Sequence, residues 1–326
     1  MKKNLKVALI VSFSLILLGC AVFSFAMMKL NWDFSELSTA KYETNEYEIN
    51  KDYKHIMIEA DMSDVELILT DSDATKVVCF DNEKVKYDVN VRGNDTGNTL
   101  DIRFNDERNW YEHIGFLCQQ TKITVYIPQN EYFDVAIKTN TGDITIPADL
   151  KFNYIEIMTD TGNVKNYAFG EELIFTTSTG DITVENVSAI DIDLRTSTGK
   201  IMMNDVVCER KITLSTSTGE NILSNVKCEK LVSEGSTGDI TLNSVIAYDD
   251  ITIKRSTGDV TLVSSDANED ILIQTTTGDV SCSLLVDKIF STKTNTGKIV
   301  LPDSWQIGGN CVVITDTGDI IIEVLN

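Results

Sequence analysis

Residues 178–181 read Ser-Thr-Gly-Asp, and a Thr-Gly pair of this kind recurs ten times between residues 141 and 318. Successive pairs lie 18 to 21 residues apart, so a period near 20 is held over ten repeats. Self-similarity at a fixed period marks a repeat architecture and outranks any local propensity. The glycines of these pairs are Gly142, Gly162, Gly180, Gly199, Gly219, Gly238, Gly258, Gly278, Gly297 and Gly318.

Apolar residues recur at fixed distances from each glycine, seven and five residues before it and two and four residues after it. The repeat around Gly258 has Ile251 and Ile253 before the glycine, and Val260 and Leu262 after it. Residues two apart share one face of a β-strand, so each repeat supplies two strands with one buried face. A short polar stretch then closes the repeat. The pattern predicts an all-β fold, a single-chain parallel β-solenoid of about ten coils of about 20 residues over residues 133–326.

The Thr-Gly pair is expected to form a corner of each coil. Glycine tolerates a positive φ and a tight bend, and stacked threonines can pair from coil to coil. The residue after the glycine is most often acidic. Asp239, Asp259 and Asp279 fall on three consecutive coils, which places their carboxylates roughly 5 Å apart. Such carboxylates can satisfy backbone N–H groups at the corner or hold a calcium ion. The sequence favours the first interpretation and leaves the second open.

The start of the chain predicts a membrane anchor. Three lysines precede residues 7–28, which carry no charge and are long enough to cross a bilayer as a helix. We predict a transmembrane anchor over residues 1–28 and a tether over residues 29–50, with lysines inside and the acidic remainder outside the cytoplasmic membrane. Residues 17–20 (Leu-Leu-Gly-Cys) also resemble a lipobox, in which Cys20 would be the lipidated residue. Both interpretations place the rest of the chain outside the membrane.

Residues 51–132 alternate apolar and polar side chains without a fixed period, which predicts half-buried strands. We expect either irregular first coils or a β cap, because an open end of stacked strands would invite aggregation. Residues 105–120 interrupt this region and carry several aromatic side chains. These either plug the end of the solenoid or form a recognition loop. The residues in question are Trp110, Tyr111, His113 and Phe116.

Composition excludes several classes of function. A net charge of −22 argues against nucleic acid, whose phosphates attract lysine and arginine. Two histidines and seven cysteines without a CxxC pair leave no zinc or thioredoxin motif, and we expect no cofactor. Cys208 and Cys228 lie one repeat apart, so they are stacked neighbours that are either reduced and buried or joined in a disulfide.

An enzymatic role has little support in the sequence. Solenoid enzymes that act on polysaccharides group acids with lysine or arginine on one outer face. Here Lys254 and Arg255 neighbour the aspartates of the corner, and Lys293 is close in period. No nucleophile with a base and no glycine-rich phosphate loop accompanies them. We therefore expect no enzyme, and keep a polysaccharide-acting enzyme only as the weakest alternative.

Three features together resemble a known family. They are "DFSELSTAKYETNEYEI" at residues 33–49, "ITVYIP" at residues 123–128, and the reiterated "STGDI" coils. The chain resembles the bacterial "putative adhesin" family of domains of unknown function, which is common in Gram-positive bacteria. The resemblance implies an extracytoplasmic solenoid on the cell envelope and offers no catalytic residues. Some relatives accompany envelope-stress systems.

The expected function is a membrane-anchored binding or scaffold module of the cell surface. Its expected partners are the cytoplasmic membrane, through the N-terminal helix, and envelope glycans or envelope proteins. The alternative is an accessory or sensor component of an envelope-stress system.

Overall fold

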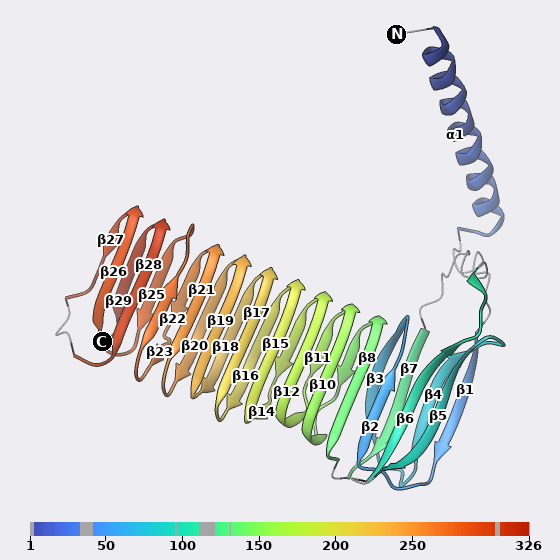
Figure 1. Ribbon diagram of the computed structural model, residues 1–326, viewed down its shortest axis with the longest axis horizontal. Coiled ribbons are helices and arrows are strands. Elements are labelled where there is room, and N and C mark those ends of the chain that lie inside the picture. Colours follow the sequence, from blue (N-terminus) through green and yellow to red (C-terminus); the bar gives the residue numbers. More distant parts are fainter. Residues whose placement is uncertain are drawn as a thin grey trace.

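The protein is a long rod of β-strands with one helix at its N-terminal end (Figure 1). The structure, a computed structural model, describes residues 3–32, 42–94, 97–110, 121–130, 132–303 and 307–325. Helix α1 (Lys3–Lys29) is followed by strands that form two sheets of 16 and 13 strands along the rod. This is the predicted all-β solenoid with an apolar N-terminal helix, so the fold class is confirmed.

The first sheet runs the length of the rod. In spatial order its strands are β1 (Glu43–Ile49), β4 (Thr75–Asp81), β7 (Thr121–Pro128), β3 (Ser63–Thr70), β9 (Ile144–Ile146), β11 (Val164–Asn166), β13 (Ile182–Glu185), β16 (Ile201–Cys208), β18 (Asn221–Cys228), β20 (Ile240–Ala247), β22 (Val260–Val263), β25 (Val280–Leu284), β29 (Ile320–Val324) and β27 (Ile299–Val300). The short strands β14 (Ser188–Ala189) and β23 (Asp266–Ala267) pair with β16 and β20.

The second sheet faces the first across the core. Its strands are β26 (Ile289–Thr296), β28 (Asn310–Thr317), β24 (Ile271–Gln274), β21 (Ile251–Thr257), β19 (Lys230–Thr237), β17 (Lys211–Thr218), β15 (Asp191–Thr198), β12 (Phe169–Thr179), β10 (Lys151–Thr161), β8 (Asp134–Thr141), β2 (His55–Glu59), β6 (Gly97–Asp106) and β5 (Val85–Asn94).

The core consists of aliphatic columns between the two sheets. Ile251 and Ile253 of β21 and Val260 and Leu262 of β22 are buried, as the spacing from Gly258 predicts. Each pairs in parallel with its counterpart one coil away, for example Val260 with Val280. Because burying such a side chain contributes about 2 kcal/mol, the columns hold neighbouring coils together.

Glycine is required at the Thr-Gly corner for two reasons. Gly180 has a φ of 150°, which other residues rarely adopt. A Cβ atom at Gly180 would also lie 2.0 Å from the carbonyl oxygen of Gly162 in the preceding coil. The glycines of successive corners therefore stack directly on one another along one edge of the rod.

The threonine that bonds between coils is not the one we expected. The threonines directly before the glycines stack in register, as Thr179 does on Thr198, but they are exposed. In seven of the ten repeats a buried threonine stands three residues before the glycine instead, namely Thr139, Thr159, Thr177, Thr196, Thr216, Thr275 and Thr315. Thr177 Oγ1 donates to the carbonyl oxygen of Gly162 at 3.1 Å, and Thr196 Oγ1 donates to that of Gly180 at 3.1 Å. A buried hydroxyl needs a partner, and the corner carbonyl of the preceding coil supplies it.

The opposite side of each coil carries the expected polar corner. One residue at this corner adopts a left-handed backbone conformation in five successive coils. These residues are Asn186, Asp205, Asn225, Ser244 and Ser264, with φ between 47° and 55°.

The C-terminal end departs from the order of the sequence. Strands β28 and β29 lie between the coil of β24 and β25 and the coil of β26 and β27. Gly318 therefore stacks on Gly278, and Gly297 forms the last corner of the rod. We expected successive Thr-Gly corners to stack in sequence order, and here that prediction is wrong.

The composition of the last two coils explains the exchange. The coil of Gly318 buries Cys311, Val313 and Ile320 completely, whereas the coil of Gly297 has Thr292 in a core column. The more apolar coil takes the inner position, where both of its faces are covered. The chain returns through Gly309, at which a Cβ atom would lie 1.8 Å from the carbonyl oxygen of Glu269.

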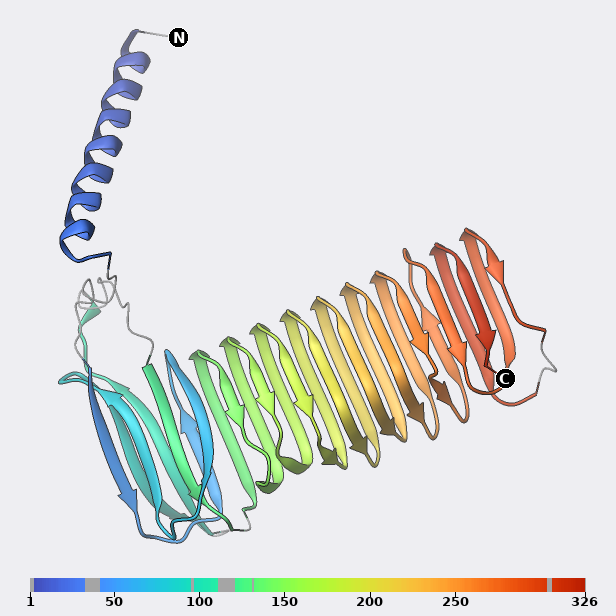
Figure 2. The same cartoon turned by 180° about the vertical axis from the view of Figure 1, so that it is seen from behind.

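The N-terminal region contains both coils and a cap. Strands β2 and β3 stack in parallel on β8 and β9, and β6 and β7 stack in parallel on β2 and β3. Strands β5 and β4 then run antiparallel to β6 and β7, and β1 runs antiparallel to β4. The antiparallel strands close this end of the rod (Figure 2).

Candidate functional site

The acidic residues of the Thr-Gly corner form one row along the rod. Asp239 Oδ1 accepts the backbone N–H of Asp259 at 2.8 Å, and Asp259 Oδ1 accepts that of Asp279 at 2.8 Å. The exchange of the last coils continues the row, because Asp279 Oδ1 accepts the backbone N–H of Asp319 at 2.7 Å. Each carboxylate thus satisfies a corner N–H group of the next coil.

This arrangement agrees with the turn-capping interpretation of the aspartates. Among the residues that the structure describes, no group of three or more His, Cys, Asp or Glu side chains is arranged to hold a metal ion. Calcium at Asp239, Asp259 and Asp279 stays an untested prediction. The row is broken by the ion pair of Lys200 and Glu220, whose Nζ and Oε2 atoms lie 2.6 Å apart.

The basic residues near this row do not form a catalytic cluster with it. Lys254 Nζ pairs with Glu234 Oε1 at 3.2 Å on the outer surface. Arg255 was expected outside, but its side chain is buried in the solenoid and donates to Ser233 Oγ at 2.9 Å. Gly235 makes room for it, because a Cβ atom there would lie 2.4 Å from an Arg255 guanidinium nitrogen. Burial lowers the pKa of Arg255 to about 10.

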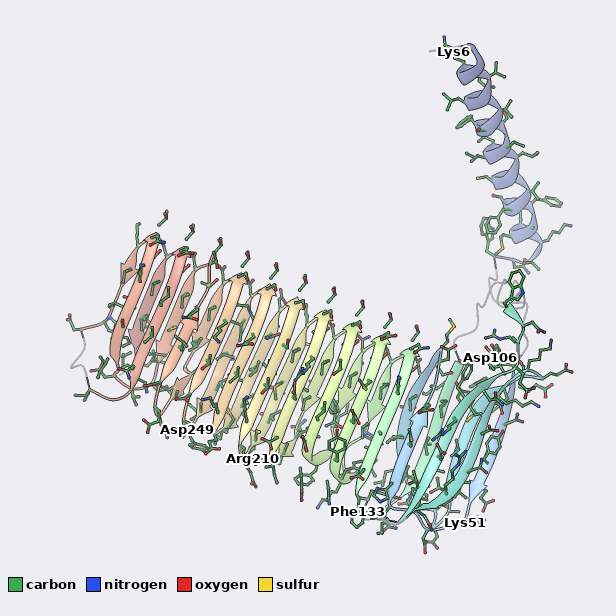
Figure 3. All side chains as sticks on the ribbon, in the orientation of Figure 1. Lys6, Lys51, Asp106, Phe133, Arg210 and Asp249 are labelled. Carbon is green, nitrogen blue, oxygen red and sulfur yellow. The ribbon has the colours of Figure 1, made fainter. Side chains whose placement is uncertain are left out.

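A cavity of about 320 Å³ lies in the N-terminal cap, beside the first corners of the rod. This volume falls within the range of small-molecule sites. Figure 3 places Asp106, a neighbour of the cavity wall, at the corner of the cap nearest α1, and Lys51 at the opposite corner. The lining combines aromatic, acidic and basic residues, and includes Tyr42, Asp61, Asp64, Phe80, Tyr87, Phe104 and Arg108.

The walls of this cap pocket are fixed by hydrogen bonds among its polar groups. Ser63 Oγ lies 2.8 Å from Tyr87 Oη and 2.5 Å from Thr121 Oγ1. Asp61 Oδ1 accepts from Asn140 Nδ2 at 2.7 Å. The ring of Tyr87 packs against that of Phe104 with centroids 5.6 Å apart. These contacts join five strands (β3, β5, β6, β7 and β8) and the bend that carries Asp61, so the pocket is part of the cap's own framework.

Arg108 and Tyr42 add a cation and a phenol to the lining of the pocket. Arg108 Nη2 and Asp106 Oδ2 lie 2.6 Å apart, and both side chains are largely buried. Burial raises the pKa of Tyr42, against the opposing effect of the Arg108 charge. Tyr42 stays neutral at physiological pH and offers a hydroxyl and an aromatic face. Aromatic faces beside paired polar groups suit a ligand that is both apolar and hydrogen bonding.

The proposed recognition loop is described only at its start. Trp110 is 77% exposed, while Tyr111, His113 and Phe116 lie outside the described residues. Whether these side chains plug the end or recognise a ligand stays a prediction. Sequence reasoning singled out this loop, which contains Arg108, but missed the pocket, because Asp61 and Tyr87 belong to segments that share no motif with it.

The cysteines of the rod are free thiols in buried positions. Cys208 and Cys228 lie in neighbouring coils, as predicted, and neither forms a disulfide. Burial raises the pKa of Cys208 to about 11 and that of Cys228 to about 12. Cys20 lies on the exposed surface of α1, and its lipidation stays a prediction.

The repeat, the corner glycines and the antiparallel cap define a β-solenoid that follows an apolar N-terminal helix. The chain belongs to the family described as Toastrack DUF4097, which matches residues 53–323. This agrees with the resemblance drawn from the sequence. None of the curated proteins matches the chain.

Solved structures of proteins from several bacteria match the chain. A "putative adhesin" of Bacteroides fragilis is 12% identical with a TM-score of 0.40, and the match covers 88% of this chain and 99% of the other. A "putative lipid binding protein" of Parabacteroides distasonis is 14% identical with a TM-score of 0.47, covering 87% and 98%. A "putative cell adhesion protein" of Clostridium sporogenes is 8% identical with a TM-score of 0.23, covering 87% and 100%. At these identities and scores the likenesses do not bear on what this chain binds.

Proposed function

We propose that the chain is a binding module of the bacterial cell envelope, anchored in the cytoplasmic membrane by α1 with its rod outside. One observation carries the proposal. Residues Leu9–Lys29 form a helix long and apolar enough to cross a membrane, and the rod that follows has its core columns filled by buried, mostly aliphatic side chains. Binding is then left to the outer surface and to the cap pocket. The lysines at the start of α1 support the outward orientation.

The orientation can be tested on intact cells that produce the full chain. A cysteine introduced at Tyr248, which is exposed on the flank of the rod, should react with a membrane-impermeant maleimide. The buried Cys228 serves as the internal control, because its thiol should react only after unfolding. Labelling of the Tyr248→Cys variant only after the cells are lysed would show that the rod faces the cytoplasm and would contradict the proposal.

We infer that the cap pocket is the binding site and that its ligand is an envelope glycan. Stacking faces on Tyr42 and Phe104, together with carboxylates of Asp61 and Asp64, match the alternating apolar faces and hydroxyl groups of a sugar. The full chain in nanodiscs should sediment with purified cell-wall sacculi. The Tyr42→Ala variant should lose at least tenfold in affinity, whereas Tyr248→Ala on the rod should bind as the wild type does. Equal binding by all three proteins would contradict a glycan site in the pocket.

A second function is favoured by the place of the same pocket. Tyr42 lies one residue before β1, so the pocket lies in the cap at the end of the rod that is joined to α1. An accessory or sensor protein of an envelope-stress system would meet its membrane partner here. Cross-linking from a photoreactive residue at position 42 separates the two functions. Cross-links to glycan favour the binding module, and cross-links to one membrane protein that disappear in the Arg108→Ala variant favour the sensor.

A further inference from the structure

Aromatic side chains make up part of the lining of the cap pocket. Tyr42, Phe80, Tyr87 and Phe104 all contribute to it, and they come from four separate segments of the cap. The rings of Tyr87 and Phe104 pack at an angle of 57°, with centroids 5.6 Å apart. The face of an aromatic ring carries partial negative charge and attracts cations. This part of the lining therefore suits a group that is apolar or positively charged.

Two carboxylates line the same pocket, and one of them has an oxygen atom available to a ligand. Asp64 Oδ1 accepts the backbone N–H of Asp143 at 2.8 Å. Asp61 Oδ1 accepts from Asn140 Nδ2 at 2.7 Å. No group among the described residues donates to Asp61 Oδ2, and this side chain is partly exposed in the pocket. Asp61 Oδ2 is therefore left to accept a hydrogen bond from a ligand.

The guanidinium group of Arg108 also lines the pocket, but a carboxylate neutralises its charge. Arg108 Nε donates to Asp106 Oδ1 at 2.9 Å, and Arg108 Nη2 donates to Asp106 Oδ2 at 2.6 Å. Counting Asp106 with the lining residues Asp61 and Asp64, three carboxylates accompany this one guanidinium group. The balance of charge around the pocket is therefore negative.

The carboxylate of Asp61 favours positive charge in the pocket and opposes negative charge. Hydrogen bonding to Asp106 raises the pKa of Arg108, and the charge of Asp61 contributes to this increase. Burial raises the pKa of Tyr87, and the charges of Asp61 and Asp81 add to the effect. A higher pKa stabilises the cationic form of Arg108 and the neutral form of Tyr87. A positively charged ligand would meet the same favourable field.

We propose that the cap pocket recognises a protonated amine, so that its ligand is an amino sugar with a free amino group. The inference rests on the proposed function, in which this pocket binds an envelope glycan, and it specifies the chemical class of that glycan. The amine would donate a charge-assisted hydrogen bond to Asp61 Oδ2 and lie against the aromatic side chains of the lining. An N-acetylated sugar carries no charge at this position and would lose most of both contributions.

A charged amine suits this pocket better than a neutral sugar, an anionic sugar or a metal ion does. A neutral sugar would displace water from Asp61 and Asp64 without compensating their charges, and a phosphate or carboxylate group would be repelled by them. Calcium takes about 6–8 oxygen ligands, and among the described residues no group of three or more His, Cys, Asp or Glu side chains is arranged to hold a metal ion. An ammonium group is stabilised by one carboxylate together with aromatic faces.

The test compares two short β-1,4-linked N-acetylglucosamine oligosaccharides, of which one is fully acetylated and the other has a single free amine. Calorimetry with the full chain in nanodiscs of zwitterionic lipid, at physiological salt, should give roughly tenfold tighter binding of the sugar with the amine. Asp61→Asn keeps the shape of the side chain and should bind both sugars alike. Asp249→Asn alters an exposed residue of the rod away from the cap (Figure 3), removes the same charge and should keep the preference.

The outcomes separate this inference from the proposed function. Equal affinity of the wild type for both sugars, lost for both in Tyr42→Ala, would keep the glycan site and overturn the amine. Failure to bind either sugar would overturn the inference, and also the proposed function if the chain failed to sediment with sacculi.

A preference for the amine that survives in Asp61→Asn would come from the acidic chain as a whole and would overturn the inference. Circular dichroism establishes that each variant is folded. If Asp61→Asn is unfolded, Asp64→Asn takes its place, because removal of the second carboxylate should also reduce the preference several-fold.

Discussion

The hydroxyl of Thr196 donates to the carbonyl oxygen of Gly180 at 3.1 Å, which joins one coil to the preceding one inside the corner. Thr196→Val keeps the shape of the side chain but leaves that carbonyl without this partner. We expect a loss of about 1–3 kcal/mol in the free energy of unfolding, measured by urea denaturation. Thr198→Val, two residues away on the exposed side, is the matched control and should change stability by less than about 0.5 kcal/mol. Equal effects would mean that the buried threonines do not bond the coils.

The corner glycines should not tolerate a side chain. A Cβ atom at Gly219 would lie 1.8 Å from the carbonyl oxygen of Gly199, and the residue has a φ of 148°. Gly219→Ala should therefore cost more than about 4 kcal/mol, which is exceptional for one substitution. Gly93→Ala in β5 is the control, because its nearest contact would be Asn98 Oδ1 at 3.2 Å. Thermal melting of the two variants measures the difference.

The inside and outside of a strand can be compared at neighbouring residues of β22. Val260 is fully buried, while Thr261 lies on the outer face. Val260→Asp should unfold or shorten the rod, since an unpaired buried charge costs several kcal/mol. Thr261→Asp should be nearly silent. Limited proteolysis and circular dichroism report both results, and similar sensitivity of the two variants would show that the assigned register is wrong.

The buried thiols should make stability fall at high pH. Burial raises the pKa of Cys79 and Cys228 to about 12, compared with 9.0 for an ordinary thiol. Between pH 9 and about 12 the unfolded chain loses these protons while the folded chain keeps them, so rising pH favours unfolding. Below pH 9 both states are protonated and the contribution is constant. Urea midpoints in a Cys79→Ala and Cys228→Ala double variant should depend less steeply on pH over this range.

The coils could be predicted from the sequence because the same spacing of apolar residues around a Thr-Gly pair recurs in each coil. The columns around Gly258 and the corner glycines follow from the period alone, and the structure confirms them. The order of the last two coils does not follow from that rule, because Gly297 and Gly318 both satisfy it. The order of these two coils depends on which of them gains more from being covered on both faces. That question compares two segments of the chain, and the spacing within each segment does not answer it.

The same limit applies to the candidate site. Arg255 stands where most coils have a buried threonine, and only the space beside Gly235, at the same position of the preceding coil, shows that its side chain turns inward. The cap pocket combines Tyr42, Ser63, Tyr87 and Arg108, which come from parallel β3, antiparallel β5 and two segments outside the strands, and no periodic signal links them. Strand patterns in residues 51–132 therefore predicted strands but not their partners.

The inserted position of β28 and β29 has a consequence for synthesis. A solenoid that stacked in sequence order could add each coil as it left the ribosome. Here the segment carrying Gly297 emerges before the layer on which it rests, so it has no complete support until residues 310–324 have been translated. Nascent chains halted before that point should leave Phe290 and Ile299 without their native neighbours, so this end should assemble only after residues 310–324 have been made.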